Sequence, residues 1–292
     1  MSGEASKIEK KRISILGCGW LGIALAQRLL VDPITSVVKA STTSEGKLAD
    51  FERRGLEGFL LPLTPGFHAE SDVVKDFFNT DSLVISLPPR SGKNEPGFYT
   101  KQIEAVVEAV RNSPVKEVIF ISSTSIYPDL NRVVTEEDVT LPEHSPAQEM
   151  VLAEKLIESL RPERTVSILR FGGLLGYNRI PGKYVQGQKD MSTGEIPVNY
   201  IHRDDGAAVI LTMLKLGVKN ETFNIVAPSH PPRKAVYLDT CGQFGWEAPT
   251  FLSPATQPDF KIISNEKFTQ NFAYEFLYPD PLRFLYMLED TV

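Results

Sequence analysis

The sequence predicts an α/β fold built on a doubly wound parallel sheet of the Rossmann type, with a smaller C-terminal lobe for a substrate. One observation behind this prediction is an apolar strand at residues 12–16 that runs into a glycine-rich turn and then a helix. Another is the alternation of strand-like and helix-like segments up to residue 176. The chain has 292 residues, of which 42% are hydrophobic, so it is long enough to bury such a core.

The glycine-rich turn, GCGWLG at residues 17–22, fits the GxGxxG pattern of dinucleotide-binding proteins. Gly17 would allow the tight turn out of the strand, and Gly19 would let a pyrophosphate approach the backbone without a Cβ in the way. Gly22 would let the helix pack closely on the strand. Because a strand precedes this motif and a helix follows it, the context favours a dinucleotide site over an ordinary glycine turn.

The helix after the turn supports the same interpretation. Leu21, Leu25 and Leu29 recur every four residues as one apolar face. The N–H groups at the helix start, including those of Trp20 and Leu21, would bind the phosphates, because the helix dipole favours negative charge there. We interpret Cys18 as a small residue inside the turn, with a reactive thiol as the alternative.

The second strand, residues 36–43, ends where a dinucleotide-binding unit usually places the residue that reads the adenosine ribose. An Asp or Glu there would select NAD, but no carboxylate occurs before Glu45. The strand end carries hydroxyl groups instead, and Lys47 follows one turn later. We therefore expect NADP as the cofactor, with NAD as the alternative. The residues expected to contact it here are Ser41, Thr42 and Thr43.

The other sheet strands are expected at residues 58–63, 83–87, 118–121, 166–169 and 222–226. Helical spacing covers three further segments: 99–111, 146–160 and 205–216. Asp205 is the expected N-cap of the last one. The carboxyl ends of parallel strands meet at one edge, so we expect cofactor contacts from Leu87, Pro88 and Ser122. Arg90 is either a further contact or a solvent-facing charge.

Composition also suggests how the chain is divided. The polar residues 1–11 are expected to form a disordered tail. The NAD(P)-binding Rossmann domain is expected to cover residues 12–176 and to take in 201–227 later in the chain. Segments rich in proline and glycine, at residues 177–200 and 228–292, are expected to form the small substrate-binding lobe.

Charge and hydropathy exclude several classes of partner. The net charge is −6, with 31 basic and 37 acidic residues, so no broad basic surface for nucleic acid is expected. The basic group at Lys7, Lys10, Lys11 and Arg12 is interpreted as a solvated tail. No apolar run approaches the roughly 20 residues of a membrane helix, and no signal peptide is visible. We expect a cytoplasmic protein without a membrane partner.

Cysteines and histidines give no sign of a disulfide framework or a metal centre. Cys18 and Cys241 are the two cysteines, and they lie far apart in the sequence. The four histidines show no i,i+4 pair and no nearby cysteine. No metal site is therefore expected.

Five segments along the chain carry a family resemblance. They are GCGWLG at 17–22, ISSTSIY at 121–127, ILRFGGLLG at 168–176, VNYIHRDDGA at 198–207 and ISNEK at 263–267. Together they resemble the extended short-chain dehydrogenase/reductases, in particular the atypical members similar to nucleoside-diphosphate-sugar epimerases. The resemblance implies a Rossmann domain that binds NAD(P) and a C-terminal lobe that closes over a small-molecule substrate, which in better-known relatives is a nucleotide sugar.

The family's catalytic residues are only partly matched. Relatives use a Ser or Thr that orients the substrate hydroxyl, a Tyr that moves its proton, and a Lys four residues later that lowers the pKa of the tyrosine. Ser123 matches the Ser/Thr position, but the Tyr position falls on Pro146 and the Lys position on Met150. None of the nine tyrosines has Lys at the fourth following position. The usual proton route is therefore expected to be missing.

Other side chains could replace it, and each has a structural alternative. Tyr127 is a candidate proton carrier or a structural residue. The acidic residues 136–138 are paired catalytic carboxylates or, more typically, a solvated face. His202 is catalytic or a satisfied hydrogen-bonding residue. Arg170 and Arg179 would meet a substrate phosphate or form ordinary ion pairs.

Two functional hypotheses follow from these observations. The first is an NAD(P)-dependent oxidoreductase or isomerase that uses Ser123 and an unidentified proton donor, with Tyr127 as a candidate. The second is a cofactor-binding protein without turnover, a sensor that reports NADP(H) to a partner. The glycine motif supports both, whereas the missing Tyr and Lys favour the second. The sequence predicts neither the substrate nor the oligomeric state.

Overall fold

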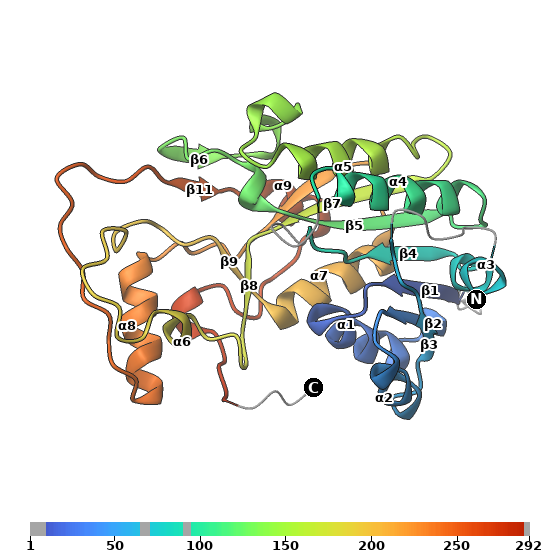
Figure 1. Ribbon diagram of the computed structural model, residues 1–292, viewed down its shortest axis with the longest axis horizontal. Helices are drawn as coiled ribbons and strands as arrows, with labels where there is room; N and C mark the ends of the chain where they lie inside the picture. The colour runs from blue at the N-terminus through green and yellow to red at the C-terminus, as the bar shows by residue number, and fades with distance from the viewer. Residues whose placement is uncertain (1–9, 65–70, 90–94, 289–292) are drawn as a thin grey trace, which may run out of the picture. The chain divides into compact units, whose positions relative to one another are not determined.

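A seven-stranded parallel sheet lies at the centre of the computed structural model, which describes residues 10–64, 71–89 and 95–288 (Figure 1). The strand order is β10-β7-β5-β4-β1-β2-β3. The strands are β1 (Lys11–Leu16), β2 (Thr35–Thr42), β3 (Glu57–Leu60), β4 (Ser82–Ile85), β5 (Glu117–Ser123), β7 (Thr165–Phe171) and β10 (Thr222–Ile225). This confirms the predicted doubly wound α/β fold.

The order of the strands reverses between β1 and β4, which pair in parallel from Ile13 opposite Ser82 to Leu16 opposite Ile85. β2 lies on the other side of β1. In open α/β sheets, ligands bind at such a reversal, outside the carboxyl ends of the strands. The glycine-rich turn leaves β1 at this point.

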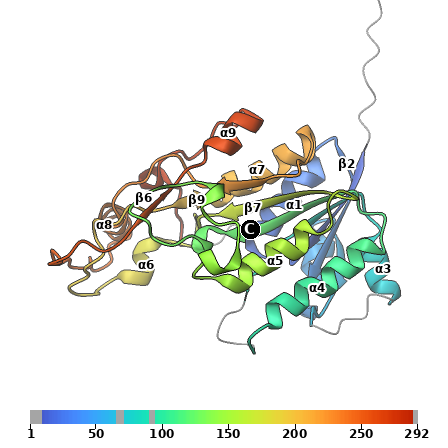
Figure 2. The same cartoon turned by 90° about the horizontal axis from the view of Figure 1, so that it is seen from above.

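Helices cover both faces of the sheet, and Figures 1 and 2 show α1 and α4 on opposite sides of it. The helices of this part of the chain are α1 (Trp20–Val31), α2 (Leu48–Arg53), α3 (Asp72–Phe78), α4 (Phe98–Arg111), α5 (Gln148–Glu158) and α7 (Arg203–Leu216). The predicted leucine face of α1 is confirmed, since Leu21, Leu25 and Leu29 are buried.

The chain divides into two compact units. Unit 1 comprises residues 1–122, 152–168 and 210–221, and unit 2 comprises residues 123–151, 169–209 and 222–292. Unit 2 also holds the remaining elements: β6 (Arg132–Val134), β8 (Gly173–Leu175), β9 (Tyr200–His202), β11 (Lys261–Ile263), α6 (Pro181–Val185), α8 (Arg233–Phe244) and α9 (Glu266–Phe272). Two small sheets, β11-β6 and β8-β9, belong to it.

Two sequence predictions need correction. Asp205 does not cap α7, because the helix begins at Arg203. Its buried carboxylate accepts hydrogen bonds from the Tyr274 hydroxyl at 2.8 Å and from the backbone N–H groups of Leu277 and Tyr278 at 2.8 and 2.9 Å. Asp205 therefore holds residues 274–278 against the start of α7 instead of capping the helix.

The basic residues before the glycine turn are not all part of a solvated tail. Lys11 and Arg12 belong to β1, and they pair with Glu117 at 2.9 Å and Asp81 at 3.1 Å. Lys7 lies outside the described residues. These ion pairs connect the start of β1 to the start of β5 and to Asp81, the residue before β4. The run of basic residues in the sequence does not show that these acidic partners lie nearby.

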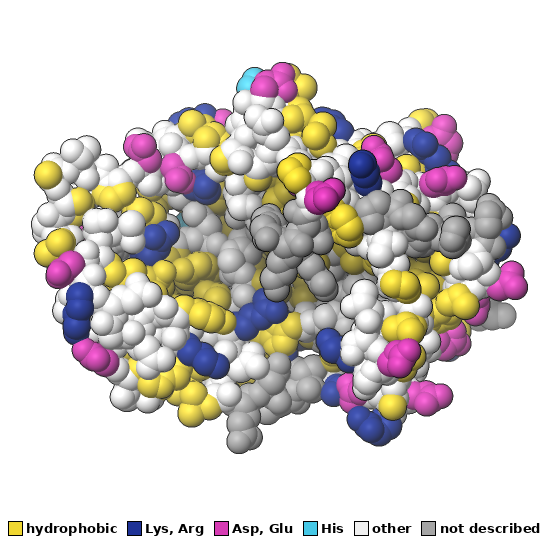
Figure 3. Space-filling view, viewed as in Figure 1, with side chains coloured by type: hydrophobic (Ala, Val, Ile, Leu, Met, Phe, Trp, Pro, Cys, Tyr) yellow, Lys and Arg dark blue, Asp and Glu magenta, His cyan; other side chains and the backbone are white. Residues whose placement is uncertain are grey.

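The surface carries mixed charge. On the face shown in Figure 3, Lys and Arg side chains are interspersed with Asp and Glu. Within the described ranges, no helix is both long and apolar enough to cross a membrane.

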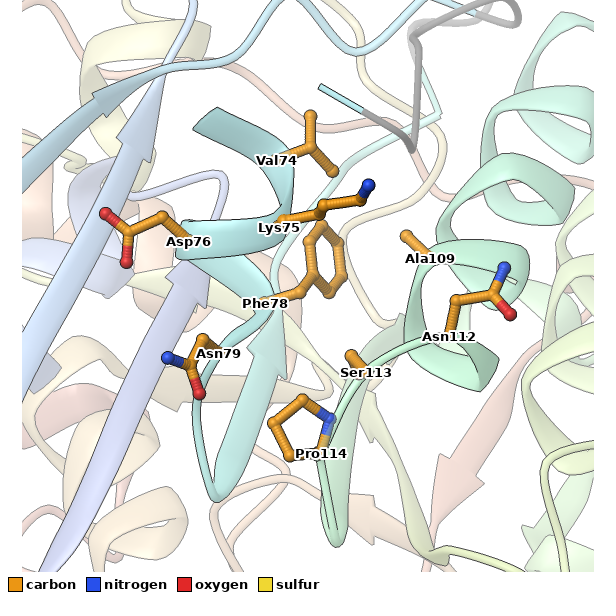
Figure 4. Close-up of a pocket in the computed structure, with 9 residues that line it drawn as sticks. All are labelled: Val74, Lys75, Asp76, Phe78, Asn79, Ala109, Asn112, Ser113 and Pro114. Carbon is orange, nitrogen blue, oxygen red and sulfur yellow. The ribbon is translucent and has the colours of Figure 1, made fainter. Parts of the chain in front are cut away.

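A pocket of about 470 Å³ opens between the C-terminal ends of α3 and α4 (Figure 4). It is lined by Val74, Lys75, Asp76, Phe78, Asn79, Ala109, Asn112, Ser113 and Pro114. Asn79 precedes β4 and Pro114 precedes β5, so this pocket lies at the amino ends of the strands. The glycine turn lies at their carboxyl ends, and the pocket is therefore separate from the predicted cofactor site.

Candidate functional site

Gly17 leaves β1 in a conformation that favours glycine. Its φ is +81°, and a Cβ built on it would lie 2.6 Å from the carbonyl oxygen of Ser86 and 2.8 Å from a methyl group of Leu87. Its N–H donates to the Ser41 hydroxyl at 2.8 Å. The turn is thus held between the ends of β2 and β4, at the reversal of strand order.

Gly19 has a different environment. The nearest atom to a Cβ built there would be the carbonyl oxygen of Gly17, at 4.0 Å, so the space in front of this backbone is open. α1 starts at the next residue, and no side chain caps its first turn among the described residues. Trp20 and Leu21 occupy that turn, which contains no acidic residue. An open backbone before an uncapped helix start fits a bound pyrophosphate.

Gly22 and Cys18 form the packed side of the turn. A Cβ on Gly22 would lie 3.2 Å from both the Cys18 sulfur and a methyl group of Ile15, so only a small residue lets α1 approach β1 this closely. Cys18 is buried, and burial raises the pKa of its thiol to about 12. The thiol therefore stays protonated at neutral pH, in agreement with Cys18 as a small packing residue.

The hydroxyl groups at the end of β2 differ in what they do. Ser41 is buried and accepts the Gly17 N–H, while Thr42 accepts a hydrogen bond from the Ser44 N–H at 3.1 Å. Thr43 and Lys47 are exposed. Of the three residues predicted to contact the cofactor here, the structure thus gives Ser41 and Thr42 roles within the protein and leaves Thr43 accessible.

Arg54 is a cation near the glycine turn that the sequence motifs did not identify. Arg54 follows α2 and pairs with Asp50 at 2.8 Å. Its charge and that of Lys47 both stabilise the thiolate form of Cys18, so both cations act electrostatically on the glycine turn. Two cations therefore lie near the turn, and the charge of Arg54 is partly offset by Asp50.

The segment after β4 also lies against the turn. Leu87 is nearly buried beside Gly17, and its carbonyl oxygen accepts a hydrogen bond from the Tyr99 hydroxyl at 2.9 Å. Pro88 is exposed. Arg90 lies outside the described residues. Tyr99, from the first turn of α4, therefore fixes the segment that the sequence predicts at the cofactor.

Ser122 is buried at the end of β5, where its hydroxyl donates to the carboxylate of Glu154. Glu154 is only 2% exposed. In the sequence Glu154 stands among the apolar residues on one face of α5. A single charged residue on such a face indicates a buried hydrogen-bond partner, and this signal could have identified Glu154. The Ser122 hydroxyl therefore connects the end of β5 to α5 through Glu154.

Ser123 begins unit 2 and is half-buried. Its Oγ accepts the N–H of Ser125 at 3.1 Å, which leaves its own proton to donate. The Ser125 hydroxyl in turn points to the sulfur of Met150 at 3.6 Å, and Pro146 is exposed before α5. Neither Met150 nor Pro146 can carry a proton, so the hydroxyl groups of Ser123 and Ser125 are the hydrogen-bonding side chains at this place.

Tyr127 is fully buried in unit 2. Its hydroxyl donates to the Asn224 side chain at 2.7 Å and accepts from Arg170 at 2.8 Å. Arg170 also donates to the carbonyl oxygens of Glu136 and Val139, at 2.9 and 3.0 Å. Both hydrogen bonds of the phenol point into the interior, which favours the structural alternative for Tyr127 and an internal role for Arg170.

The acidic residues 136–138 do not form a pair of catalytic carboxylates. Glu136 is buried and accepts the Asn224 N–H at 2.7 Å, and burial raises its pKa. Asp138 binds Arg132, which lowers its pKa, while Glu137 is exposed. One carboxylate therefore belongs to the core of unit 2 and the other two to its surface.

His202 is fully buried against Tyr278, with ring centroids 3.9 Å apart. Its Nδ1 accepts the Asp204 N–H at 3.2 Å, so Nε2 carries the proton and donates to the Leu285 carbonyl oxygen at 3.3 Å. Burial lowers its pKa. His202 matches the structural alternative, a satisfied hydrogen-bonding residue.

Comparisons with known proteins agree with this geometry. Residues 13–226 match the model of the NAD dependent epimerase/dehydratase family. Protein YeeZ of Escherichia coli K12 is 32% identical over 272 residues, which is 93% of this chain and 98% of YeeZ.

Solved structures share the fold. A short-chain dehydrogenase/reductase superfamily protein from Agrobacterium tumefaciens with bound NAD has a TM-score of 0.73 at 17% identity, covering 93% of this chain and 94% of that one. UDP-glucuronic acid 4-epimerase from Bacillus cereus, in complex with UDP-glucuronic acid and NAD, has a TM-score of 0.73 at 16% identity, covering 93% and 95%. The chain belongs to the NAD dependent epimerase/dehydratase family.

Proposed function

We propose that the chain binds NADP(H) at the glycine turn of unit 1 and acts as an oxidoreductase or isomerase on a small molecule such as a nucleotide sugar. The observation that carries this proposal is the open backbone at Gly19 before the uncapped start of α1. The substrate lobe would comprise residues 177–200 and 228–292. Relatives described with UDP-glucuronic acid and NAD support this substrate class.

The preference for NADP over NAD rests on charge. No carboxylate follows β2 before Glu45, so nothing there would repel a 2′-phosphate. Lys47 is exposed, and both it and Arg54 act electrostatically on the glycine turn. A strand end with no acid before Glu45 and with the exposed Lys47 after it favours a phosphate-bearing ribose.

The bound dinucleotide would supply hydride exchange at its nicotinamide ring. The protein's own part is to hold and orient: Ser41 fixes the turn, and Tyr99 fixes the segment at Leu87. Ser123, whose proton is available, would donate a hydrogen bond to a substrate hydroxyl or carbonyl oxygen. No tyrosine–lysine pair takes part in this proposed chemistry.

A second candidate function is an NADP(H) sensor without turnover. It is favoured by the contact between Ser125 and the Met150 sulfur, because an apolar thioether lies beside the hydroxyl groups. In this alternative the glycine turn still binds the cofactor, and binding itself is the signal.

Cofactor titrations test the premise that both functions share. Trp20 lies in the first turn of α1, so NADPH binding should quench its fluorescence. We expect NADPH to bind at least about tenfold more tightly than NADH, and Lys47→Gln and Arg54→Gln to remove most of this difference. Lys75→Gln, in the separate pocket between α3 and α4, is the control. Equal affinity for both dinucleotides would contradict the NADP preference.

Turnover then separates the two functions. Cofactor oxidation or reduction is followed with UDP-glucose, UDP-glucuronic acid and a panel of carbonyl compounds. The sugar products are also identified by NMR, because an isomerase returns the hydride to the substrate and leaves no net change in the cofactor. Activity that Ser123→Ala lowers by about a hundredfold, with unchanged NADPH affinity, supports the enzyme. Tight NADPH binding with no turnover of any compound supports the sensor.

A further inference from the structure

Glu154 is a charged residue buried inside unit 1. It lies on α5 and is 2% exposed, and its neighbours Ala153 and Ile157 on this helix are fully buried. The Ser122 hydroxyl donates to the Glu154 carboxylate at 2.5 Å, from the end of β5. Burying a carboxylate costs free energy, and a well-packed apolar residue would fill this place with less loss of stability. A carboxylate here therefore calls for a reason other than packing.

The hydrogen bond to Glu154 fixes the polarity of the Ser122 hydroxyl. A serine hydroxyl has one proton to donate and two lone pairs that accept. Ser122 directs its proton to a carboxylate, and such charge-assisted hydrogen bonds are roughly twice as strong as those between neutral groups. Among the described residues, none donates a hydrogen bond to Ser122 Oγ. The oxygen of Ser122 is therefore held as an acceptor.

Ser122 lies at the carboxyl edge of the sheet, near the level of the glycine turn. Leu16 at the end of β1 is opposite Ile85 of β4, and Ile85 is opposite Phe120 of β5. Ser122 therefore stands two residues past the row at which the chain leaves β1. Neighbouring strands lie about 4.8 Å apart, so β5 is about 10 Å from β1, on the far side of β4. This half of a dinucleotide-binding sheet takes the second nucleoside of the cofactor, the one that carries nicotinamide.

A fixed acceptor recognises a group whose own polarity is fixed. A ribose hydroxyl both donates and accepts, so it binds a free serine as well as one that is held by a carboxylate. The carboxamide of nicotinamide is different, because its NH₂ end only donates and its oxygen only accepts. An oxygen that can only accept therefore selects the NH₂ end and disfavours the reverse orientation of the amide.

We propose that Ser122 Oγ accepts a hydrogen bond from the carboxamide NH₂ of the nicotinamide cofactor, and that Glu154 is the positioning residue that holds Ser122 as an acceptor. Glu154 does not touch the cofactor in this arrangement and acts through the serine hydroxyl. This contact rests on the proposed function, because it is one contact of the dinucleotide that unit 1 is proposed to bind.

A cofactor analogue separates this hydrogen bond from general effects on the fold. In the 3-acetylpyridine analogue of NADP⁺, a methyl group replaces the carboxamide NH₂, so the donor is absent. Quenching of Trp20 fluorescence gives the dissociation constants of NADP⁺ and of the analogue. We expect the parent protein to bind NADP⁺ about fivefold more tightly than the analogue, which is the typical effect of one hydrogen bond. Equal affinity for both overturns the proposal.

Substitutions at the pair should change the ratio of these two affinities. Ser122→Ala removes the acceptor, so NADP⁺ affinity should fall by about fivefold while affinity for the analogue stays the same. Glu154→Gln keeps the shape of the side chain, but its amide can donate to Ser122 as well as accept from it. The ratio for Glu154→Gln should therefore lie between those of the parent and Ser122→Ala.

The amino edge of the same sheet provides a matched control. Ser82, at the start of β4, is 1% exposed and donates to the Glu117 carboxylate at 2.6 Å, so it forms another serine–glutamate pair in unit 1. Ser82→Ala should leave both dissociation constants unchanged, even where the loss of its hydrogen bond lowers the melting temperature. The melting temperatures of all three variants report the effects on stability separately from those on binding.

The outcomes for this contact and for the proposed function can be told apart. If the parent protein binds neither NADPH nor NADP⁺, the proposed function fails and this contact fails with it. If the parent binds NADP⁺ but Ser122→Ala weakens both dinucleotides equally, or neither, the proposed cofactor site stands and the contact with the carboxamide is refuted. Should Ser122→Ala not fold, a ratio for Glu154→Gln equal to that of the parent overturns the proposal.

Discussion

The Gly17 N–H donates to the Ser41 hydroxyl at 2.8 Å, so the glycine turn after β1 is held by the end of β2. The neighbouring Cys18 N–H donates to the Ser41 carbonyl oxygen at 2.9 Å. One residue thus fixes two consecutive N–H groups of the turn. The hydroxyl that the sequence predicts at the cofactor ribose therefore shapes the glycine turn.

Ser41→Ala should therefore affect both stability and cofactor binding. The loss of one hydrogen bond from a partly buried N–H should lower the free energy of unfolding by about 1 kcal/mol. A looser turn should also weaken NADPH binding several-fold. Urea denaturation and fluorescence titration measure the two effects. Thr43 is exposed at the end of the same strand, so Thr43→Ala should leave the free energy of unfolding unchanged. An equal loss of stability in the Ser41→Ala and Thr43→Ala variants would refute the role of Ser41.

Gly17 and Gly19 should respond differently to the same substitution. Gly17→Ala introduces a Cβ 2.6 Å from the Ser86 carbonyl oxygen at a positive φ, so we expect a loss of about 2–3 kcal/mol of stability. Gly19→Ala meets no atom closer than 4.0 Å and should fold normally. Its Cβ would instead occupy the space proposed for the pyrophosphate, so NADPH affinity should fall by at least about tenfold. Normal NADPH binding by Gly19→Ala would place the cofactor elsewhere.

Local patterns predicted the sheet well, because each of its strands is a short apolar run and the helices α1, α4, α5 and α7 have a clear 3.6-residue period. The glycine turn could be predicted for the same reason: the roles of Gly17 and Gly22 depend on the strand and helix next to them in the sequence. The short helix α2 was not predicted, and with it the position of Arg54 went unnoticed. Its six residues are too few to show a period.

Contacts between distant residues could not be predicted. Tyr127 is joined to Asn224 and Arg170, and Asp205 to Tyr274, across separations of 43 to 97 residues. A sequence motif shows that a polar residue is present, but it does not show whether its partner is solvent, substrate or another part of the chain. For this reason Tyr127 could be named as a candidate but not assigned.

Tyr127→Phe tests which role this residue has. Removing the hydroxyl leaves the buried Asn224 and Arg170 side chains each without one partner, so stability should fall by about 1–3 kcal/mol. If turnover is found, we expect its pH profile to keep the same shape, because both hydrogen bonds of the phenol point into the protein interior. A large loss of turnover with unchanged stability would instead make Tyr127 the proton carrier.

His202, which is buried, and His230, which is partly buried, should make the protein less stable in mild acid. Burial lowers the pKa of His202 and His230 below the ordinary value of 6.5. Below that value the unfolded chain binds protons that the folded chain does not, so the free energy of unfolding falls as the pH falls. Each histidine contributes a slope of at most about 1.4 kcal/mol per pH unit, between 6.5 and its lowered pKa.

The slope can be assigned with one substitution. His230 donates through Nδ1 to the Val198 carbonyl oxygen at 2.9 Å, and His230→Gln keeps a donor there without a titrating group. Urea denaturation at several pH values should show a shallower fall in stability below 6.5 for this variant than for the parent protein. A His230→Gln slope equal to that of the parent would show that His230 does not contribute.

Glu136 should change the free energy of unfolding with pH in the opposite direction, because burial raises its pKa. Its contribution to stability is present below the ordinary pKa of 4.5 and is lost as the pH rises through the raised pKa. Glu136→Gln should therefore make stability fall more steeply with decreasing pH, wherever the pH range of Glu136 overlaps that of the histidines.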